Sequence, residues 1–327
     1  MVSLKKYDCA CILLLTVLGI STLNCGGSPS SPTTSQSASS PSTPDSGSNS
    51  GSGSGGSSSG GSSSNGGSGS NSGSGGSGGN NGNPSTTSNG NQQGTTFSNL
   101  HQKGGWTGYG LLPSAYTICG GCKPSGPQVT WAMTQGVKSP SQTGNSSQFQ
   151  IGGKTSYADV LWNNHLIGDY SSQGLRDADH KLVPTLHNFT YDVYFYVTDL
   201  SVSQALEFDI NQFVNGKSFI WGHECRIGGG NEWDIWDDVG QKWHPTSISC
   251  YPKNNSWNHL VIQVQRTSDD KLLFQSIALN EKQANLNYKE DPTDTNWYGV
   301  TINYQQDGNS GQKPYSIWLD QLNFSYR

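Results

Sequence analysis

The chain has 327 residues, of which 31% are hydrophobic, and its 18 Lys and Arg against 23 Asp and Glu give a formal net charge of −5. No run of Lys or Arg with interleaved aromatic residues occurs, so the sequence predicts no nucleic-acid partner. The length is sufficient for a domain with a sizeable hydrophobic core.

The N-terminus has the pattern of a secretory signal peptide, which we place at residues 1–24. Lys5 and Lys6 precede CILLLTVLGI at 11–20, and this apolar run is too short to span a bilayer. Cys25 follows in STLNCGG, which resembles a bacterial lipoprotein signal whose cysteine becomes the lipidated first residue. The resemblance implies an exported outer-membrane or cell-surface lipoprotein that meets the membrane only through its lipid anchor. Cleavage without lipidation, giving a freely secreted protein, is the alternative.

Residues 25–96 predict a disordered linker. They are almost entirely Ser, Gly, Thr, Asn and Pro, without one aromatic residue. Such a segment cannot bury enough apolar surface to offset the entropy lost on ordering. A flexible chain of about 70 residues has a root-mean-square reach of roughly 45 Å, which would hold a folded module clear of a membrane.

Residues 97–327 predict one all-β domain. Apolar and polar residues alternate in FTYDVYFYV (189–197), ALEFDIN (205–211) and NHLVIQVQR (258–266), as expected for half-buried strands. Turn-forming Gly, Asn, Asp and Pro separate these from further strand-like stretches at 217–227, 231–238, 271–279, 297–305 and 316–326. Many strands with short connections favour an antiparallel β-sandwich or jelly roll. The contribution of residues 97–154 is left open.

Four cysteines lie in this domain, and an even number in an exported protein indicates disulfides. We prefer Cys225 with Cys250, which leaves Cys119 and Cys122 of CGGC to pair with each other. Two other connectivities are possible. A zinc site made of all four thiolates is a further alternative, although the second pair lacks the usual spacing of zinc ligands.

Several of these strands resemble the concanavalin A-like lectin and glucanase superfamily. WNHLVIQVQR (257–266) with KLLFQSIALN (271–280) resembles a hairpin of laminin-G-like and concanavalin A-like domains, and SIWLDQLNFSY (316–326) resembles their closing strand. LEFDINQ (206–212) resembles the catalytic strand of glycoside hydrolase family sixteen, and YDVYF (191–195) is similar to a strand of family twelve. Over residues 155–327 the resemblance implies a jelly roll with a ligand-binding sheet face.

The stretch LEFDINQ places Glu207, Asp209 and Asn211 on one face of a strand and their apolar neighbours in the core. The resemblance to family sixteen implies that Glu207 is the nucleophile and that Asp209 tunes it. The proton donor of that family would fall on Asn211, or on Gln212 if the strand contains a bulge. Neither amide can give up a proton near neutral pH. We therefore interpret this as a degenerate glycosidase-like strand in a surface-tethered module that binds polysaccharide or oligosaccharide.

Two alternatives to a binding module remain. The first is an active endo-glycanase acting on β-glycans, with Glu207 as nucleophile, Asp209 beside it and an acid supplied by Glu232 or Glu224. The second is a surface adhesion or structural module that contacts protein instead of sugar. A reducing-sugar assay and affinity electrophoresis distinguish the binding module from the endo-glycanase and from the adhesion module.

The candidate ligand-binding residues combine polar groups with aromatic platforms, the usual composition of a sugar site. We expect no required cofactor, and a structural calcium ion is possible because Asp carboxylates suit it. His259 shares its strand face with Gln263 and Gln265 and is expected to reach the same surface as Glu207. The full set is Glu207, Asp209, Asn211, Trp221, Trp236 and His259.

Overall fold

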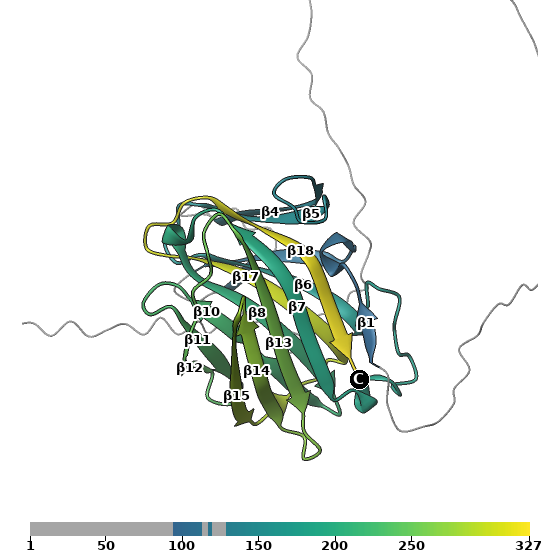
Figure 1. The fold of residues 1–327 in the computed structure, drawn as a ribbon. Helices are drawn as coiled ribbons and strands as arrows, with labels where there is room; N and C mark the ends of the chain where they lie inside the picture. The colour runs from purple at the N-terminus through teal and green to yellow at the C-terminus, as the bar shows by residue number, and fades with distance from the viewer. Residues whose placement is uncertain (1–93, 113–116, 120–128) are drawn as a thin grey trace, which may run out of the picture. The chain divides into compact units, whose positions relative to one another are not determined.

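The computed structural model describes residues 94–112, 117–119 and 129–327, with no side chains described for 117–119. Two antiparallel sheets lie face to face in this part of the chain (Figure 1). The predicted fold class, an all-β antiparallel sandwich, is confirmed. Residues 1–93 lie outside the described residues. They include the predicted signal peptide, Cys25 and most of the linker, which therefore remain predictions.

The smaller sheet has eight strands. Strand β1, Thr95–Phe97, pairs with β18 beside the main path of this sheet. The order along the main path is β15 Lys282–Glu290, β14 Leu272–Leu279, β13 Trp257–Arg266, β7 Asn188–Val197, β18 Tyr315–Tyr326, β5 Ser146–Gly153 and β4 Val129–Val137.

The larger sheet has ten strands. Two of them lie off its main path: β9 Lys217–Trp221 pairs with β8, and β16 Thr293–Asp294 pairs with β9. The main path runs β12 Lys242–Ser249, β11 Glu232–Asp237, β10 His223–Arg226, β8 Ser203–Val214, β17 Gly299–Gly308, β6 Asp159–Gly168, β2 Trp106–Leu112 and β3 Thr117–Cys119.

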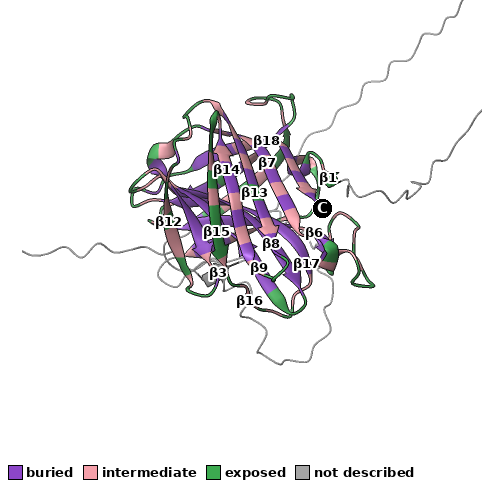
Figure 2. Ribbon diagram, turned by 60° about the horizontal axis from the view of Figure 1, so that its bottom comes forward, coloured by how far each residue is buried: buried purple, intermediate pink, exposed green. Residues whose placement is uncertain are grey.

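The core fills the space between the sheets because each strand turns its apolar residues inward. In β7 buried and half-buried residues alternate strictly, and Figure 2 shows this as purple and pink bands on β7 and β13. The 3-10 helices η1 Leu100–Gln102, η2 Val183–Thr185 and η3 Leu200–Val202 lie in the connections. Within the described ranges, we find no helix with the length and apolarity that crossing a membrane requires.

The stretch 217–227, expected as one strand, is two strands that meet at Gly222. Both β9 and β10 pair with β8, which runs past them. At the break, the Gly222 carbonyl accepts a hydrogen bond from the Trp236 amide at 3.1 Å. A Cβ at Gly222 would lie 2.9 Å from the Trp236 Cβ, so glycine allows β11 to approach closely here.

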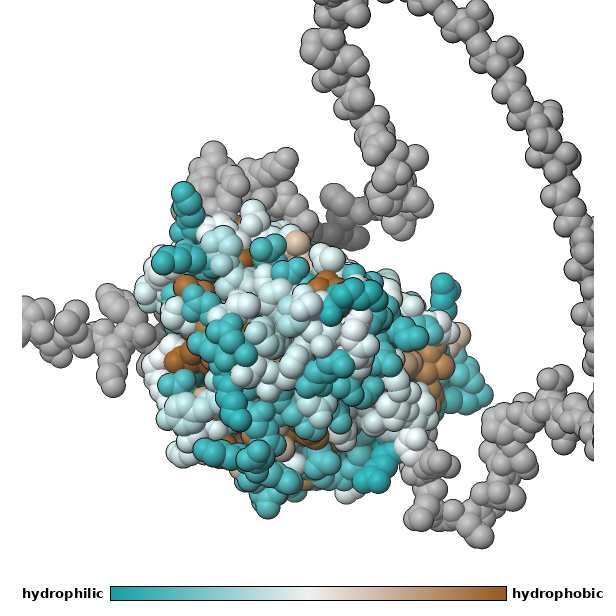
Figure 3. Space-filling view, turned by 45° about the horizontal axis from the view of Figure 1, so that its top comes forward, coloured by the Kyte–Doolittle hydropathy of each residue, from teal (hydrophilic) through white to brown (hydrophobic). Residues whose placement is uncertain are grey.

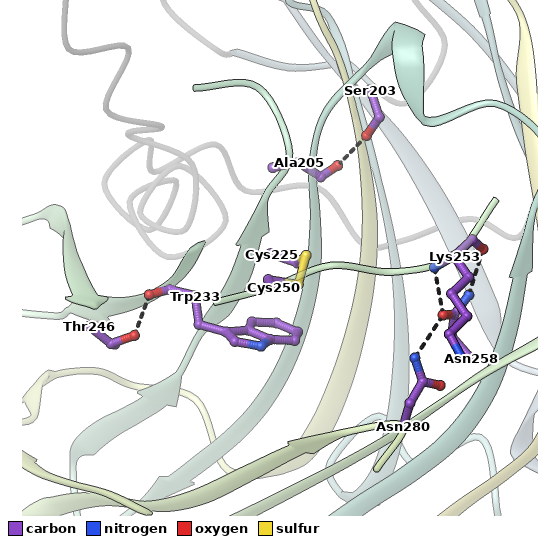
Figure 4. The surroundings of a disulfide bond; sticks show 9 residues. All are labelled: Ser203, Ala205, Cys225, Trp233, Thr246, Cys250, Lys253, Asn258 and Asn280. Carbon is purple, nitrogen blue, oxygen red and sulfur yellow. Dashed lines mark hydrogen bonds between the residues drawn. A yellow bond between two sulfur atoms is a disulfide. The ribbon is translucent and has the colours of Figure 1, made fainter. Parts of the chain in front are cut away.

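A disulfide joins Cys225 in β10 to Cys250, just after β12, with their Cα atoms 5.7 Å apart. The preferred pairing is therefore confirmed. Both cysteines are buried in the core, and Figure 4 shows the Trp233 indole beside the bond. The second predicted pair rests on Cys122 and on the side chain of Cys119, both outside the described part of the chain.

Candidate functional site

Strand β8 lies in the middle of the larger sheet and carries the predicted carboxylates. Leu206, Phe208 and Ile210 belong to the core between the sheets. Glu207, Asp209 and Asn211 therefore lie on the outer face of the sheet, as the alternation predicts. Their exposed fractions are only 1%, 0% and 3%. Both carboxylates therefore lie on the predicted face of the strand, but they are buried there and are not exposed to solvent.

Glu207 lies among three other acidic side chains. In register beside it are Gln305 of β17 and Glu224 of β10. The Gln305 Nε2 atom donates to Glu207 Oε1 at 2.6 Å and to Asp307 Oδ1 at 2.8 Å. Burial raises the pKa of Glu207 well above its usual value, and the negative charges of Asp307, Asp209 and Glu224 raise it further.

The neighbouring carboxyls are shifted in the same direction. Burial raises the pKa of Asp209 to about 7, although hydrogen bonds from the Asn303 side chain and the His223 backbone partly oppose it. Burial also raises the pKa of Asp307 to about 7 against hydrogen bonds from its neighbours. The pKa of Glu224 is raised well above its usual value, first by burial and then by Asp307. Each of these four carboxyl groups on β8, β10 and β17 therefore has a pKa above the usual value for its type.

These neighbours bear on the earlier inference that the amide of Asn211 leaves Glu207 without a proton donor. The amide at that position removes an acid from β8 itself, but β10 and β17 supply Glu224 and Asp307 next to Glu207. Glu224 was among the acids predicted from the sequence, whereas Asp307 was not. The signal for Asp307 was present in VTINYQQDG, where Thr301, Asn303, Gln305 and Asp307 alternate with apolar or amide residues.

Glu232 does not face Glu207. It lies in register with Arg226, whose Nη2 atom is 3.0 Å from Glu232 Oε2. The same guanidinium binds Asp234, with Nε 2.6 Å from Oδ2 and Nη2 3.1 Å from Oδ1. Glu232 is therefore occupied by an ion pair, and Glu224 is the better-placed of the two expected acids.

A small pocket of about 60 Å³ lies on the same outer face, next to Asn211. Its apolar wall is formed mainly by Tyr109, Phe213, Ile220 and Trp297. Its polar wall is formed by Asn163, His165, Asn211, Thr301 and Asn303.

Aromatic rings gather at this pocket. His165 stacks on Trp297 with ring centroids 5.7 Å apart and planes inclined by 20°. Tyr170 is 71% exposed, and its ring centroid lies 5.8 Å from that of His165 and 5.9 Å from that of Trp297. Burial lowers the pKa of His165, so its imidazole is neutral near pH 7. His165, Tyr170 and Trp297 were not among the binding residues predicted from the sequence. Trp297 was recognisable only as one of several tryptophans in this half of the chain.

Trp236 lies on the outer face but its ring is covered. It is fully buried and packs edge-on against Trp243, with centroids 5.2 Å apart and an interplanar angle of 67°. Ile220, which lines the pocket, belongs to the same apolar cluster. Trp236 thus supports the pocket wall, and its ring is not exposed to stack on a sugar.

Trp221 is not a stacking platform. It is fully buried in the core between the sheets, where it contacts Phe189 and Phe219. The expectation failed because Trp221 pairs with Ile210, a core residue of β8, and so points inward, whereas Ile220 pairs with Asn211 and points outward. An inward indole cannot contact a ligand on the outer face.

His259 belongs to the other sheet. It lies in β13, stacks on Tyr194 at 4.2 Å and pairs with Asp192 through a 2.8 Å contact between Nε2 and Oδ1. β13 and β8 are in different sheets, so the outer faces of the two strands point in opposite directions. The expectation that His259 shares a surface with Glu207 is therefore wrong.

The possible calcium site finds no position in the described residues. Among them, no group of three or more His, Cys, Asp or Glu side chains is arranged to hold a metal ion.

No family model and no curated protein matches the chain. Among solved structures, it is similar to the cellulose-induced protein Cip1, at 11% identity and a TM-score of 0.38, over 61% of this chain and 90% of that one. It is also similar to peanut lectin with a bound peptide, at 11% identity and a TM-score of 0.33, over 72% and 98%. Lectin II from Ulex europaeus gives 11% identity and a TM-score of 0.33, over 61% and 92%.

Proposed function

We propose that the chain binds carbohydrate through the pocket on the outer face of β6, β17 and β8. One observation carries this: the aromatic residues Trp297 and Tyr109 line the same small cavity as the buried amides of Asn211 and Asn303. The Asn211 Oδ1 atom is buried there without a hydrogen-bond partner. Sugars present apolar C–H faces and hydroxyl groups together, which is the combination that such a site complements.

The size of the pocket limits what enters it. A volume of about 60 Å³ suits the edge or a substituent of one sugar ring, not several rings side by side. The neutral amides and the neutral His165 favour an uncharged sugar. We further propose that the linker 25–96, anchored through Cys25, presents this pocket to polysaccharide at the cell surface.

Binding is tested with the full chain by affinity electrophoresis on gels containing neutral polysaccharides, and by calorimetry with oligosaccharides. We expect Trp297→Ala and Asn211→Ala each to weaken binding about tenfold, equivalent to roughly 1.4 kcal/mol. His259→Ala, on the other sheet, is the matched control and should bind like the parent. If no saccharide in the panel is retained, or if His259→Ala abolishes binding while Trp297→Ala does not, the proposed pocket is wrong.

A second candidate function, glycan cleavage, is favoured by the register of Glu224 opposite Glu207. Glycosidases use two carboxyl groups, one as acid and one as base or nucleophile, and burial here raises the pKa of both Glu207 and Glu224. Both side chains are buried, which favours binding over cleavage.

A reducing-sugar assay on β-glucans and xyloglucan decides between cleavage and binding. Release of sugar that Glu207→Gln and Glu224→Gln each abolish would make the chain an enzyme. Retention on gels without release supports the binding module. Neither retention nor release would support the adhesion alternative.

A further inference from the structure

We propose that Asp209 is a positioning residue that fixes which amide atoms face the pocket, so that the site selects a sugar with two adjacent hydroxyl groups. This rests on the proposed function. Asp209 does not line the pocket itself. It acts through a chain of hydrogen bonds that crosses three neighbouring strands.

The chain of hydrogen bonds follows the strand register. Asn163 of β6, Asn303 of β17 and Asp209 of β8 are paired across the sheet. The Asn303 Nδ2 atom donates to Asp209 Oδ2 at 3.1 Å. The Asn163 Nδ2 atom donates to Asn303 Oδ1 at 2.6 Å.

A carboxylate at the end of this chain sets its direction. An asparagine amide has two orientations of similar shape, with oxygen and nitrogen exchanged. Above its pKa of about 7 Asp209 is ionised and can only accept, so Asn303 must turn its nitrogen toward it and its oxygen toward Asn163. Asn163 must then give its nitrogen to Asn303, which leaves its own oxygen as the acceptor for a ligand.

A second pair completes the pattern at the pocket. The Asn211 Nδ2 atom donates to Thr301 Oγ1 at 3.1 Å, which frees the Thr301 hydroxyl proton for another acceptor. The Asn211 oxygen has no partner. The polar wall therefore offers two carbonyl acceptors and a hydroxyl donor. Adjacent sugar hydroxyls, each able to donate and accept, match this set.

The burial of Asp209 argues that it has more than a packing role. Its side chain is fully buried and receives hydrogen bonds from the Asn303 side chain and the His223 backbone. A buried carboxylate is costly, whereas an asparagine fills the same space at lower cost. What the carboxylate adds is that it accepts and never donates when ionised.

The experiment compares Asp209→Asn with the parent in the full chain. Binding of methyl glucoside, mannoside, galactoside and xyloside, and of their deoxy analogues, is followed by NMR titration at about pH 8.5, above the pKa of Asp209. Stability is followed by thermal unfolding. We expect Asp209→Asn to weaken the best glycoside three- to tenfold and to lose discrimination against the deoxy analogue, with Tm unchanged or higher. A packing role would instead lower Tm together with affinity.

A reciprocal change provides the rescue. In Asp209→Asn combined with Asn303→Asp, the new carboxylate accepts from both neighbours and keeps Asn163 in its original orientation. We expect affinity to return to within about threefold of the parent, whereas Asn303→Asp alone places two carboxylates side by side and binds poorly.

The outcomes separate the two proposals. If the parent binds none of the glycosides or polysaccharides, the proposed function fails. If the parent binds and discriminates, but Asp209→Asn binds and discriminates equally well, only the positioning role of Asp209 fails. A fall in Tm and affinity that the double variant does not restore also overturns it.

Discussion

Asp320 shows how strongly the properties of one carboxylate depend on its surroundings. Like Asp209 it is fully buried by neighbouring residues. Burial acts to raise the pKa of Asp320, but donors from Ser141, Gln142 and Thr143 outweigh it and hold the pKa below its usual value. Asp209 has fewer donors and its pKa rises. The balance between burial and the hydrogen bonds donated to a carboxylate therefore decides the direction of its pKa shift.

We expect Asp320→Ala to lower the free energy of unfolding by about 2–3 kcal/mol, since it leaves the donors of the β4–β5 loop unpaired. Urea unfolding measures the change. Asp192→Ala is the control, because the Asp192 side chain is 38% exposed and pairs with His259. This replacement should lower the free energy of unfolding by less than about 1 kcal/mol. Equal losses in the two variants would show that the loop contacts contribute nothing specific.

At the scale of elements, β6 and β17 approach closely at Gly168 and Gly299, which are paired across the two strands. Gly168 has φ +104°, and a Cβ there would lie 2.5 Å from the Gly299 Cα and the Tyr298 oxygen. Neither the backbone conformation nor the space admits a side chain.

Gly168→Ala should therefore destabilise the domain by about 2–4 kcal/mol, because the β6–β17 pairing must shift. Gly144→Ala is a matched control: its φ is +78°, and nothing lies within 4 Å of the added Cβ. This control should cost only about 1 kcal/mol through backbone conformation. Thermal unfolding of both variants tests whether close strand approach or conformation alone is responsible.

The disulfide ties β10 to the end of β12 across a separation of 25 residues. Replacing Cys225 and Cys250 by alanine should lower stability by about 3 kcal/mol, through the loop-closure entropy returned to the unfolded chain. Because β10, β11 and β12 are also paired within the sheet, the variant should keep its fold and its far-UV circular dichroism. A Tm unaffected by both this change and reductant would contradict a stabilising role.

At the scale of the whole molecule, the buried acids predict that stability falls as pH rises. Asp209 and Asp307 have folded-state pKa values near 7 against a usual 3.8, so unfolding releases protons between these limits. Their stabilising protonated form is complete below about pH 4 and is lost as pH rises through 7. The raised pKa values of Glu207 and Glu224 act in the same direction.

We expect the free energy of unfolding to fall by on the order of 3 kcal/mol between pH 4.5 and pH 8, measured by urea unfolding of the full chain. The Asp307→Asn variant should flatten this profile, because it removes one titrating group and one charge beside Glu207. A stability maximum at or above pH 8 in the parent would show that these carboxyls are ionised and compensated in the folded state.

Alternation along the chain predicted the strands well. The stretches 189–197 and 258–266 match β7 and β13 to within one residue at each end. The direction of Glu207 was likewise predictable, since its inward neighbours Leu206 and Phe208 are strongly apolar. These features are local: the pleat alone determines which side chains share a face.

The composition of the site was less predictable. Sequence alone could not place His259 on the opposite sheet, because alternation identifies an outward face without saying which sheet carries it. Asp307 was missed for a related reason. It lies 100 positions after Glu207 in the chain, and only the pairing of β17 with β8 brings the two together.

The sequence by itself determined that this chain contains a β-sandwich domain, which residues of β8 face outward, and which cysteines could form its disulfide. Each of these follows from spacing within a short segment. Only the tertiary structure decided that Glu224 and Asp307 flank Glu207, that Trp221 is in the core and that Asn303 links Asp209 to Asn163. Strand pairing is non-local, so the neighbours of a side chain across a sheet are set by the fold and not by its position in the chain.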